Sequence, residues 1–171
     1  MQQRTLDNLL LNGEDYTFEG SLTIYGEVNL VNCSLIVNGR LLIHDDVKIT
    51  GGNIIATHLF IEGNVSIDDG DIIVHGNLDA SNITSNRNIE VDGDSDVKQV
   101  TCLNYLISRD NNSHSITAIQ DIYILGDCDC YNLKGREIFI DGNLYFNKHS
   151  LSAKTFCCNG KIQDCFSLSV G

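Results

Sequence analysis

The sequence predicts an all-β protein: a single-stranded parallel β-helix of about eight coils with three short strands per coil. Three observations predict this fold, namely apolar residues two apart, glycines between such pairs, and a longer repeat of about eighteen residues. In LTIYGEVNL, Leu22 and Ile24 precede Gly26, and Val28 and Leu30 follow it. A spacing of two places side chains on one face of a strand, so these four apolar residues are expected to face a core.

The longer repeat appears when equivalent positions are followed along the chain. Three series of apolar residues advance in steps of 17 to 19 residues: Leu22, Leu41, Leu59, Leu78; Val28, Val47, Val65, Ile83; and Leu35, Ile54, Ile72, Ile89. Such a period is typical of a solenoid in which inward side chains stack from coil to coil. The absence of proline agrees, because inner coils must donate their amides to neighbours. The recurring glycines are expected at the corners, in positive-φ or bulged conformations.

A β-sandwich of hairpins is the alternative architecture. Asn38-Gly39 and Asn159-Gly160 are typical of tight hairpin turns, and turn residues recur at sandwich-like spacing in places.

Two parts of the chain depart from the repeat, and the β-helix domain is expected over residues 20–171. In the N-terminal segment, residues 1–19, Leu6, Leu9 and Leu10 are spaced as on a helix that begins after Thr5 and ends at Gly13. This spacing predicts a short capping helix. Near residues 94–120 the pattern lapses, and SRDNNSHS (108–115) is wholly polar, which predicts an irregular coil or loop.

Composition narrows the partners. Eleven basic and twenty-three acidic residues give a net charge of -12, which repels nucleic-acid phosphates and anionic lipid headgroups. No apolar run is long enough to span a membrane, and the N-terminus lacks the apolar run of a signal peptide. Seven cysteines form no disulfide-like framework, which favours reduced thiols in a cytoplasm.

The C-terminal residues are the candidate self-association site. Phe166, Leu168 and Val170 alternate to the end of the sequence, with no charged residue after Asp164. An uncovered last coil would pair with another copy. The alternative is that this coil packs its side chains inward.

Other residue groups are weighed for chemistry, and no catalytic residue, cofactor or metal site is predicted. Cys33, Cys102, Cys128, Cys130, Cys157, Cys158 and Cys165 match no strong zinc spacing, so core packing is favoured over metal or redox chemistry. Asp92, Asp94 and Asp96 alternate as in a calcium loop, but Leu103 stands where an EF-hand needs glutamate. His44, His58 and His75 have no partner nucleophile and are expected at surface corners.

The units LTIYGEVNL, LFIEGNVSI and IFIDGNLYF resemble the repeat of bactofilins, polymer-forming bacterial cytoskeletal proteins, over roughly residues 20–92 and 121–160. The resemblance implies a right-handed helix that self-assembles through its coil ends without nucleotide. We therefore expect a non-enzymatic structural or scaffolding protein whose partner is itself or another protein.

Two alternatives for the function stay open. One is a hexapeptide-type acyltransferase, although steps of seven such as Val28 to Leu35 break a six-residue rule. The other is a carbohydrate-binding or carbohydrate-active β-helix, with HDD (44–46) and IDDGD (67–71) lining one outer face with carboxylates.

Overall fold

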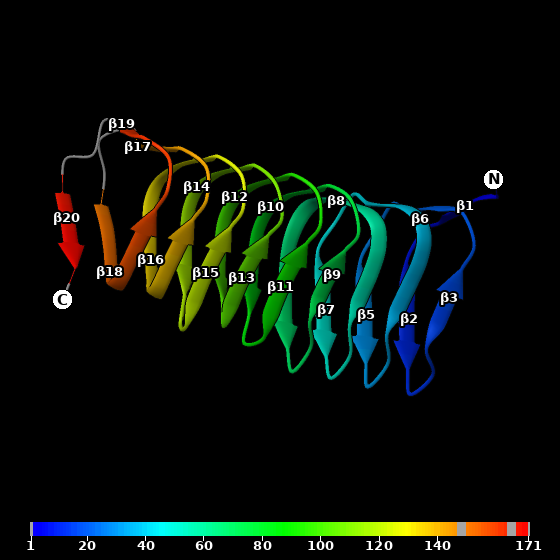
Figure 1. Ribbon diagram of the computed structural model, residues 1–171. Coiled ribbons are helices and arrows are strands. Elements are labelled where there is room, and N and C mark those ends of the chain that lie inside the picture. Colours follow the sequence, from blue (N-terminus) through cyan, green and yellow to red (C-terminus); the bar gives the residue numbers. More distant parts are fainter. Residues whose placement is uncertain (1, 147–149, 164–166, 171) are drawn as a thin grey trace.

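In the computed structural model, which describes residues 2–146, 150–163 and 167–170, the chain winds into a β-solenoid of about nine turns (Figure 1). Every strand pairing among these residues is parallel, and no described segment is helical. The predicted parallel β-helix is confirmed, and the sandwich is excluded because hairpins need antiparallel pairs. No helix long and apolar enough to cross a membrane occurs in the described ranges.

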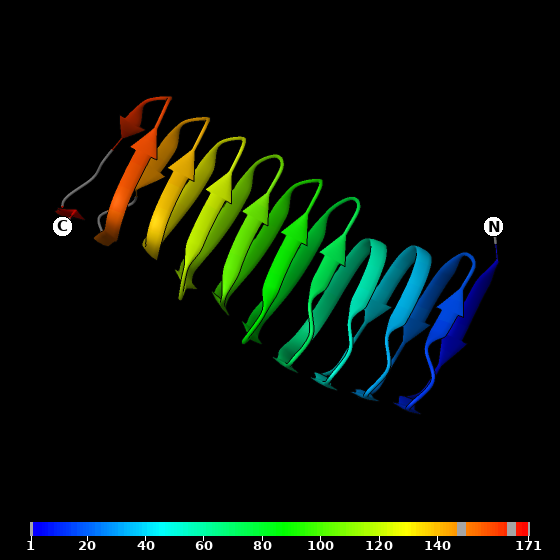
Figure 2. The ribbon, with the colours of Figure 1, turned by 60° about the horizontal axis from the view of Figure 1, so that its bottom comes forward.

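Each coil contributes one segment to each of three faces, which we name A, B and C in chain order (Figure 2). Face A consists of β1 (Gln3–Leu6), β4 (Ser21–Ile24), the end of β6 (Leu35–Ile43), the middle of β8 (Ile54–Asp68), the starts of β10 (Leu78–Ser85), β12 (Ser95–Cys102), β14 (Asn111–Ala118) and β16 (Cys128–Ile140), then β17 (Leu144–Phe146) and β19 (Ile162–Gln163).

Faces B and C complete each coil. Face B consists of β2 (Leu9–Asn12), β5 (Val28–Val31), β7 (Val47–Thr50), the later parts of β8, β10, β12 and β14, the middle of β16, the start of β18 (Ser150–Cys158) and β20 (Ser167–Val170). Face C consists of β3 (Tyr16–Phe18), the starts of β6 and β8, β9 (Ile72–Val74), β11 (Asn88–Val91), β13 (Asn104–Ile107), β15 (Asp121–Ile124) and the ends of β16 and β18.

The core is a stack of inward side chains in strict register. Along face A the inward ladder is Leu22, Leu41, Leu59, Leu78, Ser95, Asn111, Cys128 and Leu144. Successive members lie 16 to 19 residues apart, and all are buried. The three apolar series of the repeat thus become three ladders that line one continuous core.

The predicted N-terminal capping helix is wrong, because residues 3–18 form the three strands of the first coil. Leu9 is buried and stacks on Val28, whereas the side chain of Leu10 is 71% exposed. The leucine run therefore follows the period of two of a strand. A run of only three apolar residues fits either period, which is why the sequence did not decide between them.

The predicted irregular segment near residues 94–120 is also wrong. It forms β12, β13 and β14, whose inward positions stack in register on the coils before and after them. The apolar pattern lapses because several inward residues are polar. Ser95, Asn111 and Ser113 are buried, and the fully buried Tyr105 fills the space beside these small side chains.

These polar core residues satisfy one another. The Tyr105 hydroxyl lies 2.7 Å from Ser95 Oγ and donates to Asn111 Oδ1 at 3.0 Å. Ser113 Oγ donates to the same Asn111 oxygen at 3.1 Å. No described buried side-chain nitrogen or oxygen lacks a partner. The segment is therefore a regular part of the solenoid with a hydrogen-bonded core.

The corner glycines serve mainly close stacking rather than positive φ. A Cβ on Gly39 would meet the carbonyl oxygen of Gly20 one coil earlier, and a Cβ on Gly142 would meet that of Gly126. Neither Gly39 nor Gly142 has a positive φ. Positive φ occurs mainly where face B turns into face C, at Gly13, Asn32, Gly51, Gly52 and Asp69, and it occurs once between faces C and A, at Gly20.

Polar side chains form ladders along two corners. Between faces C and A, side-chain acceptors of Asn77, Asp94, Asp110, Asp127 and Asn143 each take the backbone N–H of the equivalent residue one coil later. Between faces B and C, the side-chain oxygens of Asp15, Ser34, Asn53, Asp71 and Asn104 do the same. Each ladder satisfies backbone donors that turn away from the sheets.

Candidate functional site

The first coil exposes an unpaired sheet edge. Among the described residues, β1 pairs only with β4, β2 only with β5 and β3 only with β6. The outer edge of all three strands is therefore free to accept another strand. Unpaired strand edges pair readily with other chains unless something covers or interrupts them.

Apolar side chains line the inside of this first coil. Leu6, Leu11, Tyr16 and Phe18 point toward the core and are only partly buried, because one coil alone covers them. Arg4 donates from Nη1 to the Tyr16 hydroxyl at 2.8 Å across the end. The surface thus combines free backbone groups with an incompletely covered core, and both can be satisfied by one further coil.

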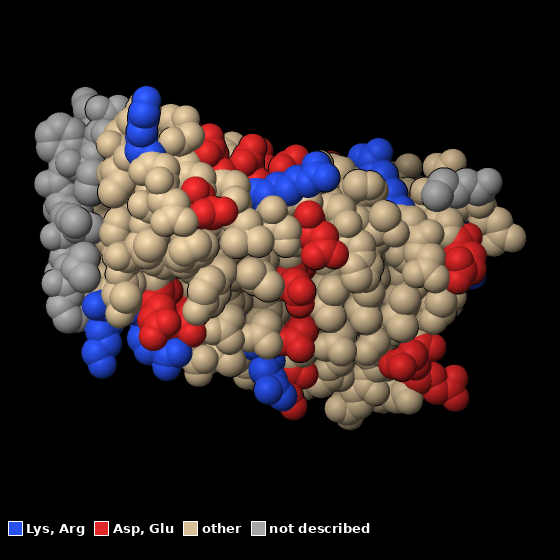
Figure 3. Space-filling view, viewed as in Figure 1, with Lys and Arg blue, Asp and Glu red and all other residues tan. Residues whose placement is uncertain are grey.

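Charge differs between the two ends of the solenoid. Residues 1–38 contain five acidic residues and one basic residue, whereas residues 130–171 contain five basic and three acidic residues. At the corner between faces B and C, the first coil carries Glu14 and the ninth carries Lys154. At the corner between faces C and A, the first coil carries Glu19, while Lys161 follows β18. In Figure 3, acidic atoms lie near the N-terminal end, and basic atoms lie beside acidic ones toward the opposite end.

The predicted self-association residues cannot be compared directly with this end. Phe166 lies outside the described residues. Leu168 and Val170 belong to β20, whose backbone pairs with β18 in register with the buried Leu151 and Ala153. The C-terminal site therefore stays a prediction, whereas the open edge of the first coil emerges from the structure.

The cysteines divide between core and surface. Cys33, Cys102, Cys128 and Cys130 are buried, in line with the predicted core packing, and burial raises the pKa of Cys102 to about 12. Cys157 is exposed and Cys158 is partly buried, while Cys165 lies outside the described residues. The described residues bring together no group of histidine, cysteine, aspartate and glutamate that could hold a metal ion.

The histidines and acidic motifs lie at corners and do not converge. His44 stacks on Tyr25 and lies 2.9 Å from Glu62, and His75 lies 3.1 Å from Asp92. His58 Nδ1 accepts the N–H of Asn77 and so joins a corner ladder. HDD (44–46) lies between faces A and B, whereas IDDGD (67–71) lies between faces B and C. The expectation that the two motifs line one outer face is therefore wrong.

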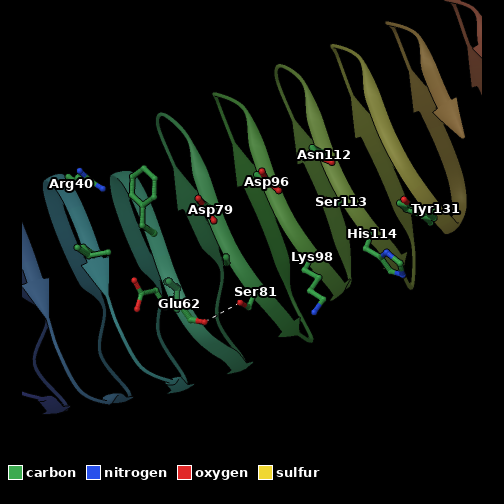
Figure 4. Close-up of a pocket in the computed structure, with 14 residues that line it drawn as sticks. Arg40, Glu62, Asp79, Ser81, Asp96, Lys98, Asn112, Ser113, His114 and Tyr131 are labelled. Atoms are coloured by element: carbon green, nitrogen blue, oxygen red, sulfur yellow. Dashed lines mark hydrogen bonds between the residues drawn. The ribbon is translucent and has the colours of Figure 1, made fainter. Parts of the chain in front are cut away.

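Face A instead carries a groove that the sequence analysis did not find, with a volume of about 700 Å³ (Figure 4). Each coil places two outward side chains on this face. The first column is Phe60, Asp79, Asp96 and Asn112, and the second is Glu62, Ser81, Lys98, His114 and Tyr131. Ser81 is the smallest member of its column, so the surface is hollow there.

The two ends of the groove are aromatic. The Arg40 guanidinium lies over the Phe60 ring at 4.4 Å from its centroid. At the other end, the rings of His114 and Tyr131 stack with centroids 4.7 Å apart. Between these ends lie carboxylates of Asp79 and Asp96 on adjacent coils. Partial burial, followed by the charge of Asp96, raises the pKa of Asp79.

Face C carries a row of apolar outward side chains. Its outward residues include Ile36, Ile55, Ile73, Leu106, Tyr123 and Phe139. Glu90 interrupts this row between Ile73 and Leu106. Figure 3 shows two fields without charged atoms on either side of an acidic column.

Comparison with known proteins adds no assignment to these surfaces. No protein-family model, curated protein or solved structure matches this chain.

Proposed function

We propose that this protein is a structural β-helix that assembles end to end with copies of itself. The observation that carries the proposal is the open edge of the first coil. A further coil placed there extends the parallel pairing of β1, β2 and β3 and covers Leu6, Leu11, Tyr16 and Phe18. At the other end of a second copy, the last described strands of the three faces, β19, β20 and the end of β18, run in the same direction as β1, β2 and β3.

The charges at the corners support a head-to-tail arrangement. When the C-terminal end of one copy meets the first coil of the next, Lys154 lies along the same corner as Glu14, and Lys161 lies along the same corner as Glu19. Opposite charges at matching corners favour this joint and disfavour joints between two like ends. The resemblance of the repeat to bactofilins points to the same kind of assembly. The proposal needs no catalytic residue, cofactor or metal.

The first test blocks the open edge without disturbing the coil itself. Leu9 donates its N–H to Glu27 in the second coil. Because alternate residues of a parallel strand bond to the same neighbour, the N–H of Leu10 faces the free edge. Leu10→Pro removes that donor, and Leu10→Ala is the matched control that removes the same exposed side chain but keeps the N–H.

The readout is solution mass by light scattering across protein concentration and salt. Wild type and Leu10→Ala are expected to form large species that grow with concentration, and Leu10→Pro is expected to remain monomeric. A wild-type monomer at all concentrations overturns the proposal. Large species that Leu10→Pro leaves unchanged refute the end-to-end joint and favour association through face C.

Charge reversal provides a second, independent test. Glu14→Lys/Glu19→Lys gives both ends a positive charge at these corners, and Lys154→Glu/Lys161→Glu gives both a negative charge. Each variant alone is expected to assemble less than wild type, and a one-to-one mixture is expected to assemble again. Failure of the mixture to recover would show that these corners do not meet. The rescue is expected to weaken as salt rises.

A further inference from the structure

The groove on face A has features that end-to-end assembly does not use. It lies midway along the solenoid, lined by residues of β6 to β16, and both sheet edges of each of its central strands are already paired. From Phe60 to Tyr131 it crosses four coil steps, or ~19 Å at the usual strand separation of ~4.8 Å. A cavity of this shape fits an extended chain better than a compact small molecule.

Four polar side chains of the groove have no partner among the described residues. No hydrogen bond or ion pair within the described part of the chain reaches the side chains of Asp79, Asp96, Lys98 or Asn112. Carboxylates along the corners differ, since Asp71, Asp110 and Asp127 each accept a hydrogen bond. Figure 4 shows Asp79, Asp96 and Asn112 in one row on successive coils, with Lys98 beside them. The groove thus offers acceptors and donors at regular intervals.

The chemistry of these groups narrows the ligand. Three carboxylates, from Glu62, Asp79 and Asp96, outnumber the cations of Arg40 and Lys98, so a polyanion such as nucleic acid or an acidic glycan is disfavoured. An extended peptide binds most readily by adding a strand to a free sheet edge, and the floor of this groove has none. Hydroxyl groups, by contrast, pair with carboxylate, amide and ammonium groups alike. Aromatic rings at both ends provide apolar surface beside polar groups.

We infer that this groove binds an uncharged, extended oligosaccharide strand. The sugar hydroxyls bond to Asp79, Asp96, Asn112 and Lys98, and apolar faces of the sugar rings lie near Phe60 and Tyr131. The groove acts here as a binding site, with no reaction assigned to it. This inference does not depend on end-to-end assembly, because no groove residue belongs to the first or the last coil.

Isothermal titration calorimetry of the full chain tests the inference, with chitohexaose and cellohexaose as uncharged probes and hexagalacturonate as the acidic probe. At least one uncharged hexamer is expected to bind with a Kd between micromolar and millimolar, more tightly than its trimer, because a trimer leaves part of the groove empty. Asp79→Ala/Asp96→Ala is expected to weaken binding by about tenfold or more, since charge-assisted hydrogen bonds are lost.

Two further variants separate binding in the groove from effects on the fold. Ser81→Trp fills the hollow while keeping every proposed ligand-binding group, and it is expected to abolish binding. Glu90→Ala removes an exposed carboxylate from face C and is expected to bind like wild type. Circular dichroism shows whether each variant keeps the wild-type fold.

The inference is overturned by any of three results. One is the absence of binding heat with both uncharged hexamers at millimolar concentration. Another is binding that Asp79→Ala/Asp96→Ala and Ser81→Trp leave unchanged. The third is binding in the groove of hexagalacturonate alone, or of a lysine-rich peptide in place of the sugars. None of these results bears on the light-scattering tests of assembly.

Discussion

Removing the hydroxyl of Tyr105 is expected to destabilise the fold far more than one oxygen atom suggests. Tyr105 is fully buried, and its hydroxyl pairs with Ser95 at 2.7 Å and with Asn111 at 3.0 Å. In Tyr105→Phe, Asn111 still accepts from Ser113, but the buried Ser95 hydroxyl loses its bond to the Tyr105 hydroxyl. A buried hydroxyl without a hydrogen-bond partner lowers stability by about 1–3 kcal/mol. We therefore expect the free energy of unfolding to fall by about 2 kcal/mol.

The measurement is urea unfolding followed by circular dichroism, carried out in the Leu10→Pro background so that assembly does not contribute. Tyr123→Phe is the matched control, because it removes the same atom from an exposed ring on face C. Its cost is expected to stay below about 0.5 kcal/mol. The m-values should agree, so that a shifted midpoint reports stability.

A fourfold variant tests the physical reason. S95A/Y105F/N111V/S113A replaces the whole hydrogen-bonded group by apolar residues and leaves no partner stranded. It is expected to cost less than Tyr105→Phe alone, because desolvation penalties disappear together with the bonds. If Tyr105→Phe is as harmless as Tyr123→Phe, or if the fourfold variant is much the least stable, the account of this polar core is wrong.

Three further outcomes follow from stacking, ionisation and burial. Gly142→Ala places a Cβ against the Gly126 carbonyl and is expected to lower the free energy of unfolding in urea by about 1–3 kcal/mol. Gly135→Ala should lower it little, because the atoms nearest to the new Cβ are 3.3 Å away and belong to side chains. Equal losses of stability in the two variants would contradict the stacking argument. Hydrogen bonds from the backbone and side chain of Asn143 lower the pKa of Asp127, so the stabilisation from this carboxylate is present above the unfolded pKa of about 4 and is lost as pH falls through the lower folded pKa. Asp127→Asn keeps the acceptor and should flatten this acid dependence of stability, measured by unfolding between about pH 5 and pH 2. An unchanged profile would show that the carboxylate does not contribute. Iodoacetamide labelling, read by mass spectrometry, should modify the exposed Cys157 in the folded protein. It should spare Cys102, because burial raises the pKa of this thiol to about 12. Prompt labelling of Cys102 would contradict its burial.

The fold could be predicted because the inward positions of most coils are apolar and recur at regular spacing in the sequence. The ladders that begin at Leu22, Val28 and Leu35 are apolar over the first coils, so a period of two inside a longer period was visible. The regular coils after Gly93 were not predicted because several of their buried positions hold polar residues. Ser95 and Asn111 are buried almost as fully as Leu41, but only their spatial neighbours show how their polar atoms are satisfied.

The candidate sites were less accessible to sequence reasoning. The groove depends on outward residues, whose identity carries no periodic signal, and on one small residue, Ser81, between larger neighbours. The open edge depends on whether Leu9 and Leu10 belong to a helix or a strand, which three leucines cannot decide. One feature could have been found: Gly76-Asn77, Gly93-Asp94, Gly126-Asp127 and Gly142-Asn143 recur near the coil period and mark a corner ladder.

Because the ladders are in register, the length of this molecule can change only in steps of whole coils. Every coil contacts only the coil before and the coil after it, and equivalent positions such as Leu41 and Leu59 have equivalent neighbours. Deleting or duplicating the stretch between two such positions changes the rod by one step of ~4.8 Å and leaves each remaining side chain on its own ladder. A deletion of one residue within a strand instead turns the following inward side chains outward. Variation in length is therefore expected in whole coils, which would make such a rod adjustable as a spacer without a new fold.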